Sequence, residues 1–221
     1  MPQLTRPRFG LVTTVWLLLF LLGSIVACDQ INPTGQGILF EDRFTPTQIT
    51  NWHLEGDAQG RTLLMNEQLI IQIDAPNTIQ YATLLDPTFS DFVLEVDARL
   101  LSGPEDSSYG VLFRQDENGR FYRFQITGTG LYILERRNGD GSWTRLTNEW
   151  SESDAIHRGA NRVNQLRIEA VGPWLAVYVN GQLLHEVSDT AYTSGTIALD
   201  AGTFGQPGVQ VAFDNVVVRQ P

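Results

Sequence analysis

The stretch FVLEVDARLL, residues Phe92–Leu101, alternates apolar and polar side chains along most of its length. In an extended chain, one face of this segment carries four apolar side chains, those of Leu94, Val96, Ala98 and Leu100. The opposite face carries the charged side chains of Glu95, Asp97 and Arg99. A period of two residues with one apolar face predicts a half-buried strand of an antiparallel sheet.

Similar patterns recur on both sides of this strand. The dipeptide Asn180-Gly181 between two apolar runs predicts a two-residue hairpin turn. The polar segment Asp154–Asn164 predicts a loop, and no long window has a helical period. These patterns predict an all-β fold, a two-sheet antiparallel β-sandwich of jelly-roll type. Further strands are expected at Ile38–Phe44, Gln68–Ile73, Gln80–Leu85, Tyr109–Gln115, Phe121–Thr127, Leu131–Arg136, Trp143–Asn148, Gln165–Val171, Leu175–Val179, Gln182–Val187, Gly195–Ala201 and Val209–Val218.

The N-terminus has the composition of an export signal. Arg6 and Arg8 precede an uncharged apolar run, Leu11–Ala27, which is short for a bilayer span of about 20 residues. Residues 1–27 are therefore predicted to be a signal peptide. The exit Ile25-Val26-Ala27-Cys28 resembles the bacterial lipobox. That resemblance implies that Cys28 is acylated, for example with palmitate, and that the lipoprotein is anchored to a bacterial cell membrane on its extracytoplasmic face.

The rest of the chain divides into a tether and one domain. Residues 28–37 hold the lipidated cysteine and a Gly- and Pro-containing tether, and residues 38–218 form the β-sandwich domain. Cleavage at Cys28 removes two arginines from a chain of net charge −10, which leaves −12. Such a charge argues against a nucleic-acid partner and favours neutral over acidic ligands.

Six segments carry a resemblance to a known superfamily. They are Phe92–Asp97, Tyr109–Arg114, Phe121–Phe124, Asn164–Glu169, Val177–Gly181 and Phe213–Val216. Their ordered succession is similar to the concanavalin A-like lectin and glucanase superfamily, which includes LamG-like domains. Within it, the domain resembles the 3-keto-disaccharide hydrolases. The resemblance implies a concanavalin A-like jelly roll, but this fold carries lectins, hydrolases and interaction modules alike.

The segment Glu95-Val-Asp97-Ala-Arg99 is the first candidate site. Laminarinase-like glycosidases of this superfamily carry Glu-x-Asp-x-Glu, in which the first Glu is the nucleophile and the last is the general acid. Here Arg99 stands at the position of the last Glu, and arginine cannot supply a proton at neutral pH. Glu95 and Asp97 remain catalytic candidates. The alternatives are a ligand-binding face and a solvated face with ion pairs to Arg114 and Arg123.

A second candidate site adds arginines and aromatic rings. Arg114 and Arg123 alternate with apolar neighbours and are expected to line the same face as Glu95, Asp97 and Arg99. Trp143 is expected to offer a ring on which a sugar could stack. Together these side chains make up the predicted ligand-binding set.

No cofactor and no catalytic metal are predicted. A structural calcium ion is the one alternative, because Glu41 and Asp42 lie on the first expected strand and Asp214 on the last. The only cysteine is the proposed lipid site, so no disulfide is expected.

Three functions follow from these patterns. The first is a lipid-anchored extracytoplasmic module that binds a carbohydrate or another polymer. The second is a glycoside hydrolase of the 3-keto-disaccharide hydrolase type, which the family resemblance implies. The third is a non-catalytic scaffold or interaction lipoprotein. The missing general acid favours a non-catalytic role and leaves open whether the domain is an enzyme.

Overall fold

A computed structural model describes residues 1–3, 37–46 and 51–221. Cys28 and nearly all of the expected signal peptide and tether lie outside the described residues. The chain divides into two units, Met1–Pro33 and Thr34–Pro221, and every described strand belongs to the second. The described residues contain no candidate membrane-spanning helix.

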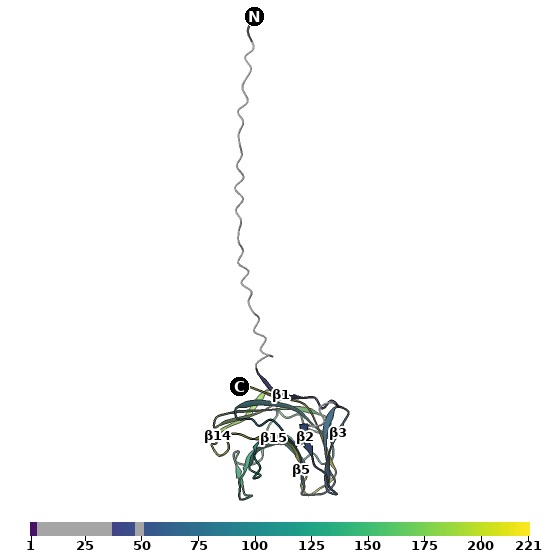
Figure 1. The fold of residues 1–221 in the computed structure, drawn as a ribbon. Helices are drawn as coiled ribbons and strands as arrows, with labels where there is room; N and C mark the ends of the chain where they lie inside the picture. The colour runs from purple at the N-terminus through teal and green to yellow at the C-terminus, as the bar shows by residue number, and fades with distance from the viewer. Residues whose placement is uncertain (4–36, 47–50) are drawn as a thin grey trace. The chain divides into compact units, whose positions relative to one another are not determined.

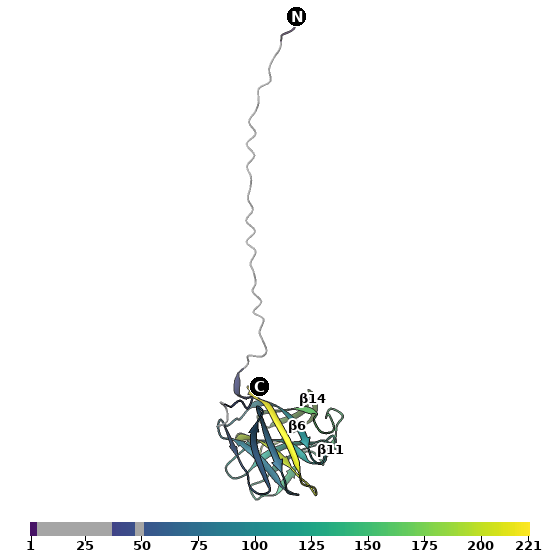
Figure 2. The same ribbon diagram turned by 90° about the vertical axis from the view of Figure 1, so that its right-hand side faces the viewer.

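The second unit consists of two eight-stranded antiparallel sheets, sheet A and sheet B. In sheet A, the C-terminal strand β16 lies between β6 and β4, and β1 also pairs with β16 (Figure 2). The order of sheet A is β14 (Gln182–Ser188), β13 (Trp174–Val179), β12 (Val163–Val171), β6 (Phe92–Ser102), β16 (Val209–Arg219), β4 (Gln68–Ile73) and β3 (Gly60–Met65), with β1 (Ile38–Asp42) beside β16.

Sheet B packs against sheet A and curves so that its outer face is concave (Figure 1). Its order is β10 (Trp143–Arg145), β9 (Leu131–Arg137), β8 (Phe121–Thr127), β7 (Ser108–Gln115), β15 (Thr196–Gly202), β5 (Ile79–Leu84) and β2 (Trp52–Leu54), with β11 (Ser151–Glu152) paired to β9. This architecture confirms the expected two-sheet sandwich.

The alternation of the sequence decides which side chains fill the space between the sheets. On β6, the inward side chains of Phe92, Leu94, Val96, Ala98 and Leu100 are fully buried. On β7 and β8, the core receives Tyr109, Val111, Phe113, Tyr122, Phe124 and Ile126. Burial of this apolar surface is the main term that stabilises the fold. The same alternation sends the remaining side chains of each sheet to its outer face.

The structure confirms the expected hairpin turn and differs from the expected strands in several places. The Asn180-Gly181 turn joins β13 to β14, and both residues have positive φ, 51° and 80°, as a type I′ hairpin requires. Strands β2 and β3 were not expected, because β2 has three residues and β3 has an apolar run without alternation. Strand β10 ends at Arg145 rather than Asn148.

Candidate functional site

The outer face of sheet B carries a row of side chains that crosses five strands. The register pairs Tyr81 with Asp200, Asp200 with Gly110, Gly110 with Gln125, and Gln125 with Ile133. Their chain neighbours, such as Tyr109 and Val111 on β7, point into the core. The row therefore lies on the concave face, away from sheet A.

Gly110 lets two of these side chains meet across a strand. Gln125 and Asp200 are on β8 and β15, which flank β7, so their backbones are about 9–10 Å apart. The amide Nε2 of Gln125 nevertheless donates a hydrogen bond of 2.6 Å to Asp200 Oδ2. A Cβ at position 110 would lie 2.0 Å from the carbonyl oxygen of Phe124. The sheet thus needs glycine here, and glycine leaves room above it for the Gln125–Asp200 contact.

Asp200 is a fully buried carboxyl group on the floor of this face. Its Oδ1 has no hydrogen-bond partner among the described residues. Burial raises the pKa of Asp200 to about 7, although the nearby Arg123 and the hydrogen bond from Gln125 oppose the shift. The carboxyl group is therefore poised to exchange a proton near neutral pH.

Arg123 on β8 and Trp143 on β10 are in contact on the outer face of sheet B. The Arg123 guanidinium lies over the Trp143 ring, 4.1 Å from its centroid, and forms an ion pair with Glu135. Phe121 meets the same indole edge to face, with 5.7 Å between the ring centroids. Trp143 remains 40% exposed. The contacts with Arg123 and Phe121 hold an accessible ring in a fixed orientation.

Three adjoining hollows follow the outer face of sheet B. One of about 310 Å³ is lined by residues that include Gln125, Glu135 and Arg145. A second, of about 250 Å³, shares Arg123 with the first and is also lined by Trp143. A third, of about 610 Å³, shares three lining residues with the second, namely Tyr81, Gln115 and Gly119. Because neighbouring hollows share walls, they form one groove, which we call the sheet B groove.

The chemistry of the sheet B groove suits a hydroxylated ligand. Arg123, Gln125 and Glu135 supply donors and acceptors, and Trp143 supplies an apolar ring. Burial, followed by the charge of Glu55, raises the pKa of Tyr81, so its hydroxyl stays protonated at neutral pH. A few oriented polar groups beside an exposed ring can bind sugar hydroxyls and one apolar sugar face together.

The structure separates the predicted ligand-binding set. Glu95, Asp97 and Arg99 lie on β6 in sheet A, whereas Arg123 and Trp143 lie in sheet B. The expectation that all of them share one face is therefore wrong, because β6 pairs with β12 and β16 and not with β7 or β8.

On sheet A the charged side chains of β6 find local partners. Glu95 is paired with Arg219 and, at 4.0 Å, with Arg167. Asp97 accepts a hydrogen bond from Asn215 Nδ2, and Arg99 donates one to Gln68. The expected ion pairs of this face with Arg114 and Arg123 are thus replaced by pairs within sheet A.

Arg114 is also absent from the outer face, because its side chain is buried. It is the penultimate residue of β7, has a φ of 50°, and donates hydrogen bonds to the backbone carbonyls of Ser90, Gly172 and Tyr192. These carbonyls belong to three different loops. Arg114 therefore ties loops together, a role that alternation alone could not reveal.

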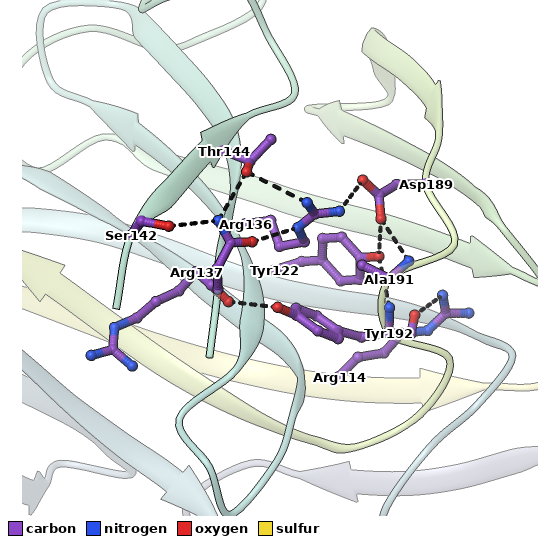
Figure 3. Close-up of polar contacts among 10 residues, drawn as sticks. Arg114, Tyr122, Arg136, Arg137, Ser142, Thr144, Asp189, Ala191 and Tyr192 are labelled. Carbon is purple, nitrogen blue, oxygen red and sulfur yellow. Dashed lines mark hydrogen bonds and ion pairs between the residues drawn. The ribbon is translucent and has the colours of Figure 1, made fainter. Parts of the chain in front are cut away.

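The loop between β14 and β15, which contains Tyr192, is held in place by a second polar network (Figure 3). Asp189 accepts hydrogen bonds from the Tyr122 hydroxyl at 2.6 Å, from Arg136 and from the backbone N–H of Ala191. Burial would raise the pKa of Asp189, but these hydrogen bonds outweigh it and lower the pKa. The loop that follows β14 is thus fixed to β8 and β9 beside the third hollow.

The candidate ligands of the alternative calcium site are not gathered around one point. The terminal strands β1 and β16 do pair, but Asp42 faces Val216 in the register and Asp214 faces Asp97. Buried Asp42 accepts hydrogen bonds from Phe44 N at 2.7 Å and Trp52 Nε1 at 2.9 Å. Within residues 37–46 and 51–221, no three Asp, Glu, His or Cys side chains, Glu41 included, are grouped so that they could hold a metal.

Several residues of the groove were not singled out from the sequence. They are Glu135, Arg137 and Arg145, which line it, and Asp200, which is buried on the same face of sheet B. The sequence did point to Asp200, because it is a charged residue in the expected apolar strand Gly195–Ala201. The period of two places its side chain on the outer face of that strand. The others follow only from the pairing of β8, β9 and β10.

Solved structures share this fold at low sequence identity. A carbohydrate-binding module, CBM66 from Bacillus subtilis, superposes with a TM-score of 0.61 at 17% identity, covering 77% of this chain and 96% of that module. A β-glucanase from Bacillus licheniformis superposes with a TM-score of 0.62 at 12% identity, covering 85% of this chain and all of the glucanase. No curated protein sequence is significantly similar to this chain.

A family comparison is more specific than these fold similarities. The family described as the 3-keto-alpha-glucoside-1,2-lyase-like domain matches residues 39–219, which include every strand from β2 to β16 and most of β1. The match confirms the resemblance to 3-keto-disaccharide hydrolases, and the solved structures confirm the jelly-roll fold. The chain belongs to the family of 3-keto-alpha-glucoside-1,2-lyase-like domains.

Proposed function

We propose that this protein is a carbohydrate-binding module whose ligand lies in the sheet B groove. The observation that carries the proposal is the Arg123–Trp143 pair, an accessible indole held under a guanidinium and beside a hollow with further polar side chains. The carbohydrate-binding module and the β-glucanase named above have the same fold, which supports a glycan ligand over other polymers.

Affinity electrophoresis through gels that contain single polysaccharides tests this function. At least one polysaccharide should retard the protein, and Trp143→Ala should weaken retention by about tenfold, which corresponds to about 1.4 kcal/mol. Trp174→Ala is the matched control, because Trp174 is exposed on β13 of sheet A. Equal loss in both variants, or no retardation by any glycan, would refute the proposal and favour a scaffold role.

The proposed location is the extracytoplasmic face of a bacterial membrane, with the chain anchored through lipid on Cys28. The support is the positively charged start, the apolar run Leu11–Ala27 and the cysteine directly after it. Incorporation of a labelled palmitate analogue into the wild-type protein, and its loss in Cys28→Ser, tests this location. Equal labelling of the two proteins would contradict it.

The family description supports a second function, cleavage of a 3-keto-glucoside. In such an elimination a base removes the proton at C2, the bond from C1 to the glycosidic oxygen breaks, and that oxygen gains a proton. Glu135 would be the base, because it is the one carboxylate among the described residues that line the two hollows around Arg123. Release of the leaving sugar from a 3-keto-glucoside, lost in Glu135→Gln but retained in Glu95→Gln, would establish this activity; no release by wild-type protein would exclude it.

A further inference from the structure

The two smaller hollows of the sheet B groove differ in sign of charge from the whole chain. The charged side chains that line its two smaller hollows are those of Arg123, Arg137, Arg145 and Glu135. Arg123 and Glu135 neutralise one another in an ion pair. Arg137 and Arg145 remain, so this part of the groove is positive in a chain of net charge −10.

Arg137 and Arg145 have no carboxylate partner in the described part of the chain. Arg137 donates a hydrogen bond to the carbonyl oxygen of Gly119 at 2.6 Å, and Arg145 is exposed. By contrast, Arg136 on the core-facing side of β9 is paired with Asp189, and Arg120 beside the third hollow is paired with Asp116. The two unneutralised guanidiniums are therefore concentrated beside Trp143.

The pairing of β9 with β10 places these groups around one position. Trp143 lies opposite Arg137, and Arg145 lies opposite Glu135. Directly opposed side chains in an antiparallel pair have Cβ atoms about 5 Å apart. A sugar ring stacked on the indole would therefore have its substituents within reach of a guanidinium on either side. A guanidinium binds a planar carboxylate or a sulfate ester with two parallel hydrogen bonds.

We infer that the sheet B groove binds an acidic glycan, with the anionic group of one sugar held by Arg137 and Arg145 beside Trp143. This inference rests on the proposed glycan-binding function and specifies its ligand class. It departs from the preference for neutral glycans suggested by net charge, because local charge in the groove outweighs charges that lie beyond the screening distance of about 8–10 Å.

Two matched pairs of polymers test the inference on the full protein. Polygalacturonate is compared with its carboxyl-reduced form, and dextran sulfate with dextran, by affinity electrophoresis at low and high salt. At low salt, at least one charged polymer should be retained about tenfold more strongly than its neutral partner, and added salt should reduce the difference. The first pair identifies a carboxylate as the recognised group, and the second a sulfate.

Arg145→Gln should lower the charged-to-neutral ratio about fivefold, and Arg145→Lys should restore part of it. Arg61→Gln is the control, because Arg61 is exposed on β3 of sheet A. Equal retention of charged and neutral polymers would overturn this inference but leave the proposed function standing. Retention by none of these four polymers would overturn this inference, whereas the proposed function falls only if no polysaccharide retards the protein. An unchanged ratio in Arg145→Gln would overturn the placement of the anionic group.

Discussion

Replacing Asp200 by Asn should change how the stability of the protein depends on pH. The pKa of this carboxyl group is raised by burial from its ordinary value of 3.8 to about 7. Between these values the folded protein holds a proton that the unfolded chain has released. Each pH unit in that interval therefore lowers the free energy of unfolding by about 1.4 kcal/mol.

The sign and the size of the effect follow from this shift. The penalty is absent below the unfolded pKa of 3.8, grows as the pH rises, and is complete above the folded pKa of about 7. Three pKa units correspond to an upper value of about 4 kcal/mol. Asn cannot ionise, and its Oδ1 can still accept the hydrogen bond from Gln125. The variant should therefore gain stability relative to wild type as the pH rises from about 4 to 7.

Urea unfolding followed by tryptophan fluorescence, at a series of pH values from about 4 to 8, measures this difference. Asp116→Asn is the control, because hydrogen bonds from Arg120 and Asn118 outweigh the effect of burial and lower the pKa of Asp116. Its loss of stability should appear above the unfolded pKa and vanish as the pH falls. A difference between Asp200→Asn and wild type that stays constant with pH would refute the reasoning.

Three further substitutions test the packing of the fold and the position of the binding site. Gly110→Ala should lower the free energy of unfolding in urea by about 3 kcal/mol, because the new Cβ would lie 2.0 Å from the Phe124 carbonyl oxygen; a loss below about 0.5 kcal/mol would contradict this. Asp42→Ala should cost about 3 kcal/mol in the same assay, because the buried Trp52 indole N–H loses its acceptor; an unchanged free energy of unfolding would contradict this. Glu95→Gln should leave glycan retention unchanged, because its side chain is on sheet A, and a tenfold loss of retention would move the site to that sheet.

The alternation of the sequence was enough to predict the class of fold and the inward face of its strands. The segment Phe92–Leu101 shows this, since each residue expected inside is fully buried. Alternation gives the face of a strand within its own sheet but not the sheet to which the strand belongs. Strands β6 and β8 have the same pattern, yet they lie in opposite sheets, and this separates Glu95 from Arg123.

The rest of the site depends on contacts between segments distant in the chain. Arg114 has the outward parity of a strand residue, but a positive φ at the end of β7 turns its side chain toward the carbonyls of three loops. The contact between Gln125 and Asp200 joins residues 75 positions apart, and it needs a glycine on the strand between them. Local propensity contains no information on such pairings.

The resonances of the tryptophan indole N–H groups test the central claim most directly. The protein is titrated with the oligosaccharide unit of the polymer that retains it most strongly, and a proton–nitrogen NMR spectrum is recorded at each step. The Trp143 resonance, assigned with Trp143→Phe, should shift with the ligand, whereas that of Trp174 on sheet A should stay in place. A shift of Trp174 with an unmoved Trp143 would contradict binding in the sheet B groove.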